Sequence, residues 1–232
     1  MHRTDDDQEQ GGEQSGKRRI FLVDDHPITR QGLADLIRLQ PNLTVCGEAA
    51  DGAGALTALP AAEPDLILLD LSLPDRHGLE LVKDIHALFP QVLVLVFSMH
   101  DEKVYAERAL HAGARGYVMK DQGGARLLEA IERVFAGEIY VSPAISNRIL
   151  DSFYCHSAHR KGSLIGALTD REFEVFELLG QGLTTGEIAA QLYLSPKTVE
   201  CHRLHIREKL GLKTGPELIK QAVRWSGAQG LV

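Results

Sequence analysis

Acidic, hydroxyl and amine side chains follow four short apolar segments of the chain, and together they could carry phosphoryl chemistry. The side chains at these four ends are Asp24 with Asp25, Asp70, Ser98 and Lys120. Three crowded carboxylates repel one another unless a cation compensates them, and Mg²⁺ prefers such oxygen ligands. An amine and a hydroxyl are the groups needed to hold an anion beside the metal. Because a carboxylate is already deprotonated, Asp70 could attack phosphorus without a separate base.

The elements that position these side chains alternate between strands and helices. The segments 20–23, 66–69, 92–97 and 116–119 are apolar on consecutive residues, which indicates strands buried on both faces, and 43–46 adds a fifth. Helical patterns cover 27–39, 53–59, 78–89, 101–111 and 124–135, and Pro60 is expected to stop the second. Five strands and five helices predict a doubly wound parallel sheet, in which ligands gather at the carboxyl ends of the strands.

Each of these residues also has an ordinary structural explanation. Asp70 precedes the turn formers Pro74, Asp75 and Gly78, so alone it would be expected to cap the turn. Ser98 alone could cap a helix, and Tyr117 alone could be a core residue. Their joint position at neighbouring strand ends favours the chemical interpretation.

Composition and charge limit the class of protein. The chain has 232 residues and is 44% hydrophobic, enough for two globular domains. Residues 1–18 predict a disordered tail. No apolar run is long enough to cross a bilayer, so we expect a cytoplasmic protein without a membrane partner. Cys46, Cys155 and Cys201 lie far apart and predict reduced thiols, not disulfides or a zinc site.

The two halves of the chain differ in charge. Residues 1–136 hold 14 basic and 22 acidic side chains, whereas residues 137–232 hold 11 and 10. Within the second half, the span 197–224 has seven basic and three acidic side chains. This modest basic patch is compatible with a negatively charged partner.

The second half predicts a helix-turn-helix domain at 166–228, after a linker at 137–165 that contains one helix at 145–153. Thr169 with Glu172, and Thr184 with Glu187, form capping boxes that open two helices. Ser195-Pro196 opens a third and longer helix. Two short helices that lead by a tight turn into a longer one describe a helix-turn-helix.

The third of these helices is the expected DNA-reading element. Val199, Ile206 and Leu210 share its core face, which leaves the opposite face for bases and phosphates. Glu200 could accept from a cytosine amino group, and Cys201 or Leu204 could touch a thymine methyl group. The candidate DNA-binding residues are Lys197, Thr198, Glu200, Cys201, Arg203, Leu204, Arg207 and Lys209.

The front motifs resemble the receiver domain of two-component response regulators over residues 19–136. They are Leu22-Val23-Asp24-Asp25-His26, Leu68 to Pro74 with Gly78, Phe97-Ser98, and Ala112-Gly113-Ala114 with Gly116 to Lys120. The resemblance implies a flavodoxin-like fold in which Asp70 accepts the phosphoryl group, Ser98 and Lys120 contact it, and Tyr117 switches together with Ser98. It implies Mg²⁺ ligands at Asp24, Asp25, Asp70 and the Ser72 backbone carbonyl. By the same analogy Ser72 and His100 affect the lifetime of the phosphoryl group. Asp121 departs from the family, because many receivers have proline there, and this affects the expected shape of that loop.

The back motifs resemble the LuxR-type domain, and the order of the two domains is that of the NarL/FixJ class. The motifs are Leu168 to Glu172, Gly182 with Glu187-Ile188-Ala189, and Leu194 to Glu200 with His202 to Gly211. The resemblance implies a small four-helix domain whose last helix, at 217–225, pairs two copies on DNA. Its apolar residues Leu218, Ile219, Ala222 and Val223 could serve this pairing or the domain's own core.

The whole pattern predicts a transcription regulator and not a turnover enzyme. A sensor histidine kinase would phosphorylate Asp70, and the protein would bind double-stranded DNA, with a homodimer formed on phosphorylation or on DNA and RNA polymerase as a further partner. Unmasking of the recognition helix and dimerisation of receivers both remain open as routes to DNA. A Mg²⁺-dependent phosphohydrolase ranks lower, because neither a second acid for hydrolysis nor a P-loop is visible. A ligand-sensing regulator would require an apolar pocket in the front domain.

Overall fold

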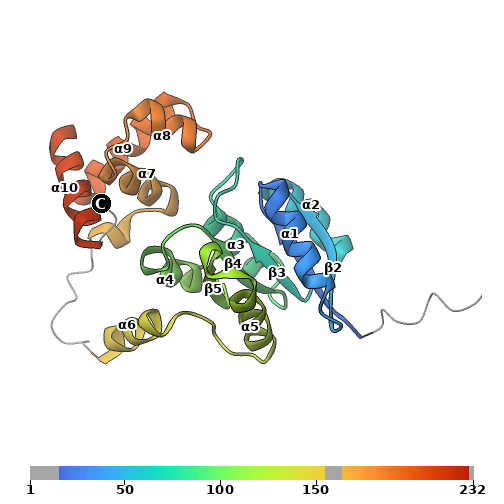
Figure 1. The fold of residues 1–232 in the computed structure, drawn as a ribbon. Helices are drawn as coiled ribbons and strands as arrows, with labels where there is room; N and C mark the ends of the chain where they lie inside the picture. The colour runs from blue at the N-terminus through green and yellow to red at the C-terminus, as the bar shows by residue number, and fades with distance from the viewer. Residues whose placement is uncertain (1–15, 155–163, 230–232) are drawn as a thin grey trace, which may run out of the picture.

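The structure, a computed structural model, describes residues 16–154 and 164–229 (Figure 1). Most of the expected tail, residues 1–15, and Cys155 lie outside the described residues. Cys46 and Cys201 are free thiols. Among the helices that the structure describes, none is long and apolar enough to cross a membrane.

The first domain is built on a five-stranded parallel sheet in the order β2-β1-β3-β4-β5. The strands are β1 (Arg18–Val23), β2 (Leu43–Ala49), β3 (Leu66–Leu69), β4 (Leu93–Ser98) and β5 (Gly116–Met119). The register pairs Val23 with Leu69, and Leu69 with Val96. The residues that follow these three therefore meet at one edge, and the predicted doubly wound sheet is confirmed.

Helices cover both faces of this sheet because alternate strand residues point to opposite sides. Ile20 and Leu22 belong to the core under α1 (Pro27–Arg38) and α5 (Gly123–Phe135). Phe21 and Val23 belong to the core on the other side, under α2 (Gly52–Ala62), α3 (Gly78–Leu88) and α4 (Glu102–Ala112). Both faces are thus buried, which explains the continuous apolar runs.

The expectation that Pro60 ends the second helix was wrong. Pro60 lies inside α2, which continues to Ala62. A proline so near the carboxyl end removes a single backbone donor, and the helix tolerates that loss. The helix ends instead at Glu63, which adopts a left-handed conformation (φ 40°) and donates its amide to the Leu59 carbonyl at 3.0 Å.

The first domain extends beyond the expected limits at both ends. Arg18, assigned to the tail, begins β1 and pairs with Leu43. Tyr140, assigned to the linker, is buried and forms a parallel bridge with Gly116. Helix α6 (Pro143–Tyr154) then packs against α4 and buries Ile145. The first part of the linker therefore belongs to the first domain.

The second domain is a four-helix unit preceded by a short 3-10 turn, η2 (Leu164–Ala167). Its helices are α7 (Asp170–Gly180), α8 (Thr185–Gln191), α9 (Pro196–Leu210) and α10 (Gly215–Gln229). Both predicted capping boxes are present, at the starts of α7 and α8. Val199, Ile206 and Leu210 are buried as the helical pattern predicted.

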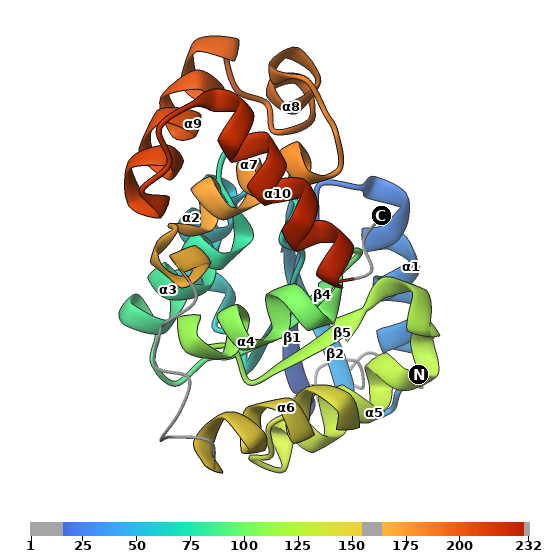
Figure 2. The same cartoon turned by 90° about the vertical axis from the view of Figure 1, so that its left-hand side faces the viewer.

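Helices α7 and α10 cross at close range, and Gly180 makes the crossing possible (Figure 2). A Cβ atom on Gly180 would lie 2.7 Å from the Ala222 carbonyl oxygen and closer still to Ser226 Oγ. We predict that Gly180→Ala destabilises the second domain by about 1–3 kcal/mol because the backbone of α10 must move. Urea unfolding of the full chain measures this change.

Gly186→Ala is the matched control for this prediction. Gly186 lies in α8, and a Cβ atom there would meet nothing within 4 Å. It should leave stability unchanged or raise it by up to about 1 kcal/mol, because alanine favours helix. Equal unfolding midpoints for the two variants would contradict the close crossing.

Candidate functional site

Lys120 joins two buried carboxylates at the carboxyl edge of the sheet. Its Nζ atom lies 2.6 Å from Asp24 Oδ2 and 2.6 Å from Asp70 Oδ2. Asp24 and Asp70 are 2% and 3% exposed. Burial alone would lower the pKa of Lys120, but the two carboxylates outweigh burial and raise it above its ordinary value. The amine is therefore charged and compensates the crowded acids.

Ser98 and Tyr117 connect the Asp70 carboxylate to the neighbouring loop. Ser98 Oγ, fully buried at the end of β4, donates to Asp70 Oδ1 at 2.7 Å. Tyr117 is buried on β5, and its hydroxyl donates to the His100 carbonyl oxygen at 2.8 Å. Burial, followed by the nearby Asp70 charge, raises the pKa of Tyr117 well above its ordinary value, so this phenol stays protonated. The predicted switch pair thus lies beside the acid.

The same edge offers oxygen ligands that fit a divalent cation. Ligand atoms of Asp24, Asp25, His26 and Asp70 all lie within 4.8 Å of one another. Asp25 Oδ1 is buried without an aligned hydrogen bond in the described part of the chain, although His26 Nδ1 is 2.6 Å away. This carboxylate oxygen is therefore available as a ligand for a cation. Hard carboxylate oxygens of this kind suit Mg²⁺.

Ser72 and the loop after β5 complete the edge. The Ser72 amide donates to Asp70 Oδ1 at 3.3 Å, and its hydroxyl lies 3.2 Å from His100 Nε2. Asp121, where the sequence departs from the receiver pattern, lies in the 3-10 turn η1 (Lys120–Gln122). The departure leaves Lys120 in contact with both acids.

The predicted DNA-reading face of α9 is exposed, and its members differ in how they are held. Leu204 is 43% exposed, and Lys197 and Cys201 are also exposed. Arg207 is half-buried. Thr198 Oγ1 pairs with the cap residue Ser195 at 2.7 Å, and Lys209 Nζ donates to Glu172 on α7 at 2.6 Å. Lys209 therefore already has a partner within the domain.

Glu200 and Arg203 are held together by a residue that the sequence did not indicate. Arg203 Nη1 donates to Glu200 Oε1 at 3.0 Å and to Thr185 Oγ1 at 2.5 Å. Thr185 Oγ1 in turn donates to Glu200 Oε1 at 2.7 Å. Thr185 opens α8, so these contacts join the two helices of the helix-turn-helix.

The four apolar residues of the last helix divide into two pairs. Leu218 and Ala222 are fully buried in the core of the second domain. Ile219 and Val223 are 41% and 43% exposed. In this conformation, only Ile219 and Val223 of these four have surface available for a second copy.

Comparison with known proteins identifies both domains. Residues 20–132 match the family model of the response regulator receiver domain, and residues 166–222 match that of bacterial regulatory proteins of the luxR family. Oxygen regulatory protein NreC of Staphylococcus carnosus (strain TM300) is 32% identical over 210 residues, 89% of this chain and 97% of that protein. NreC of Staphylococcus aureus (strain JH9) is 35% identical over the same shares. The chain belongs to the NarL/FixJ family of two-component response regulators.

Solved structures of response regulators share this fold. A LuxR-family two-component response regulator from Aurantimonas sp. SI85-9A1 is 38% identical, with a TM-score of 0.55, over 60% of this chain and 99% of that one. RcsB of Salmonella enterica serovar Typhimurium, bound to promoter rprA with the phosphomimetic BeF3-, is 25% identical over 88% of this chain and 97% of that one, with a TM-score of 0.58. The protein is a DNA-binding transcription regulator controlled by phosphorylation.

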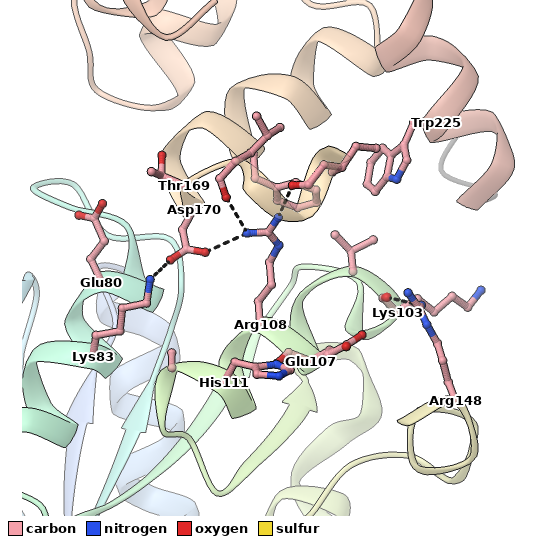
Figure 3. A pocket seen from close by; sticks show the side chains of 15 residues that line it. Glu80, Lys83, Lys103, Glu107, Arg108, His111, Arg148, Thr169, Asp170 and Trp225 are labelled. Atoms are coloured by element: carbon pink, nitrogen blue, oxygen red, sulfur yellow. Dashed lines mark hydrogen bonds and ion pairs between the residues drawn. The ribbon is translucent and has the colours of Figure 1, made fainter. Parts of the chain in front are cut away.

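In this response regulator, the receiver contacts the DNA-binding domain through charged side chains (Figure 3). Asp170 on α7 is nearly buried and accepts from Lys83 of α3 at 2.7 Å and from Arg108 of α4 at 3.1 Å. The Arg108 guanidinium also lies 3.9 Å from the centre of the Phe173 ring. These residues line a cavity of about 650 Å³ between the domains, together with Trp225 of α10.

A buried tyrosine forms the second part of the domain contact. Tyr105 on α4 is fully buried, and its hydroxyl donates to Glu177 Oε2 on α7 at 2.6 Å. The same ring lies 4.6 Å from the His100 ring, centre to centre, and 5.6 Å from Phe173. The sequence patterns did not predict a role for Tyr105, Arg108 or Asp170 in a domain contact. The available signal was weak. Acidic side chains recur on consecutive turns of α7, at 170, 174 and 177, although a helix gains from acids only in its first turn.

Glu174 and Glu177 of α7 are also buried in this contact, and burial raises the pKa of both carboxyls. Burial raises the pKa of Glu174 to about 7, although Arg171 at 2.7 Å opposes the shift. His77 faces the same carboxyl at 3.9 Å, and burial lowers its pKa to about 3, so that imidazole is neutral. The charges of Glu177 and Glu80 add to the shift of Glu174. Burial likewise raises the pKa of Glu177.

We predict that Lys120→Met destabilises the receiver by about 3–5 kcal/mol in the presence of a chelator, because it leaves two buried carboxylates without their shared cation. Added Mg²⁺ should recover part of this loss, since a divalent cation compensates the same acids. Urea unfolding with and without Mg²⁺ measures both effects. Lys103→Met, at an exposed position of α4, is the control and should change neither; a Lys120 variant as stable as wild type would contradict the role of the amine.

We predict that the domain contact loosens as the pH rises. The carboxyl of Glu174 has a raised pKa in the closed arrangement, so its stabilisation is complete below its ordinary pKa of 4.5 and is lost as the pH rises to about 7. Small-angle scattering should show a larger radius of gyration at pH 8 than at pH 5.5. Glu174→Gln should weaken this dependence, and Glu129→Gln, on α5 with a side chain 43% exposed, should keep it; identical profiles for wild type and Glu174→Gln would contradict the assignment.

Proposed function

We propose that this regulator accepts a phosphoryl group on Asp70 from a sensor histidine kinase, and that the change is read at the contact between the receiver and α7. The observation that carries the proposal is the arrangement around Asp70. One of its carboxylate oxygens is 2.6 Å from Lys120 Nζ, and the other is 2.7 Å from Ser98 Oγ. These are the donors that a phosphoryl group on this carboxylate requires.

Phosphoryl transfer to Asp70 requires mainly that the reacting groups are held in position. An Asp70 oxygen forms the bond to phosphorus while the bond from phosphorus to the kinase imidazole nitrogen breaks, and the electron pair leaves with that nitrogen. Lys120 neutralises charge that develops on the phosphoryl oxygens, and Ser98 donates a hydrogen bond to one of them. No general base is needed, because the attacking carboxylate is ionised.

Receiver domains typically bind Mg²⁺, and the fit of the acids at this edge supports a Mg²⁺ site here. Asp24, Asp25, Asp70 and the Ser72 carbonyl would hold the ion. When bound, it supplies positive charge beside the phosphoryl oxygens. Asp24 would then share its charge between this ion and Lys120.

The contacts beyond Ser98 support a route to the DNA-binding domain. The His100 amide lies 3.5 Å from Ser98 Oγ, and the His100 carbonyl accepts from Tyr117. The His100 ring packs on Tyr105, which bonds Glu177 of α7. A Ser98 hydroxyl that turns toward a phosphoryl group would move this loop and weaken the hold on α7.

The consequence that we propose concerns α10 and not the exposed face of α9. The Trp225 ring of α10 packs edge to face on Phe173, with ring centres 5.3 Å apart. The guanidinium of the receiver's Arg108 lies over the same Phe173 ring. Release of this cluster would free the helix that presents Ile219 and Val223 to a second copy. A homodimer on double-stranded DNA, contact with RNA polymerase and a cytoplasmic location are part of this proposal.

Asp70→Asn tests the phosphoacceptor assignment. With a small acyl phosphate and Mg²⁺, the wild type should incorporate phosphate and bind promoter DNA more tightly, and the variant should do neither. Phosphate incorporation is measured by intact-protein mass spectrometry, and DNA binding is measured by fluorescence anisotropy.

Asp121→Asn is the matched control, because Asp121 is an exposed acid beside Lys120. It should incorporate phosphate like the wild type. Undiminished phosphate uptake by Asp70→Asn would refute the assignment. Normal uptake by the wild type without any change in DNA affinity would refute the proposed coupling alone.

A further inference from the structure

The hydroxyl of Thr185 closes a ring of hydrogen bonds on the DNA-facing side of the second domain. It donates to Glu200 Oε1 at 2.7 Å and accepts from Arg203 Nη1 at 2.5 Å, while Arg203 Nη1 also donates to Glu200 Oε1 at 3.0 Å. The donors and acceptors match, because a hydroxyl has one proton to give and lone pairs to receive. The ring fixes the rotamers of two α9 side chains from a residue on α8.

The two charged members of the ring differ in exposure. The Glu200 side chain is 59% exposed, whereas the Arg203 side chain is only 19% exposed. Arg203 Nη2 also lies 3.9 Å from the position of a Cβ atom on Gly215, at the start of α10. Arg203 is thus held between three helices, and Glu200 is the member that a partner can reach.

We propose that Thr185 is a positioning residue for sequence recognition: it holds the Glu200 carboxylate so that its second oxygen accepts from the amino group of a cytosine. This inference rests on the proposed DNA-binding function and on the expectation from the sequence that α9 enters the major groove. Both hydrogen bonds found for this carboxylate in the described part of the chain end on Oε1, which leaves Oε2 for an outside donor. Cytosine N4 is the major-groove donor that a carboxylate matches.

The ring also compensates the charge of Glu200. An unpaired carboxylate on this face would repel the phosphates of any sequence. Paired with Arg203, the acid adds little net charge, so it can contribute to the choice of base without weakening DNA binding in general. A freely rotating carboxylate would lose the fixed direction that base selection requires.

Selection of binding sites from a random DNA pool, with the full-length protein and Mg²⁺, tests the proposal. The wild type should enrich cytosine at one position of each half-site. Thr185→Val, which keeps the shape but removes the hydroxyl, and Glu200→Ala should both lose this enrichment, with about a tenfold drop in discrimination against the other bases. Thr185→Ser retains the hydroxyl and should restore the preference.

Further measurements separate this inference from a failure of the docking. Lys197→Met should weaken binding to all sequences evenly and lower the salt dependence by about one ion. If it has no effect, the docking of α9 is wrong. If it behaves as expected but Thr185→Val keeps the cytosine preference, or lowers affinity evenly for all sequences, Thr185 has no role in recognition. Urea unfolding of each variant verifies that the domain is folded.

Discussion

The bridge from Lys120 to Asp24 and Asp70 is the interaction on which the rest of the molecule depends. Two carboxylates that are almost fully buried repel each other, and the Lys120 amine between them offsets that repulsion. Parallel strands bring the three residues to one edge, although 96 positions separate Asp24 from Lys120. The charge of the acids at this edge is therefore partly compensated by one amine before any phosphate arrives. The phosphoryl group that we propose on Asp70 would change the partners of Lys120 and Ser98.

The sequence predicted the sheet, the reactive side chains at the ends of its strands and the helix-turn-helix, because each depends on local patterns. Consecutive apolar residues, turn formers after Asp70 and the two capping boxes are short-range signals, and all three appear as expected. Pro60 misled the prediction because the effect of a proline depends on its position in the helix. Near the carboxyl end of α2 it does not break the helix, and the sequence alone did not reveal where α2 ends. Tyr140 misled the prediction because the apolar run Ile139–Val141 is only three residues long and does not reveal its partner strand.

Contacts between distant residues could not be predicted in the same way. Tyr105 and Glu177 are 72 positions apart, and nothing in either helix distinguishes this tyrosine from a core residue. Thr185 looks like an ordinary first residue of a helix, and its hydrogen bonds with Glu200 and Arg203 form only because α8 packs on α9. Whether Leu218 or Ile219 faces the core depends on how α10 crosses α7, which the periodicity of α10 alone left open.

The buried acids of α7 explain why the domain contact can be reversible. To raise the population of the open domain arrangement from 1% to 99%, an event must favour the open over the closed arrangement by about 5.5 kcal/mol. A phosphoryl group supplies about one to three charge-assisted hydrogen bonds, each worth about 1.5–3 kcal/mol. Glu174 and Glu177 lie buried in the contact at a cost in desolvation, so they make the closed arrangement less favoured than apolar side chains at the same positions would.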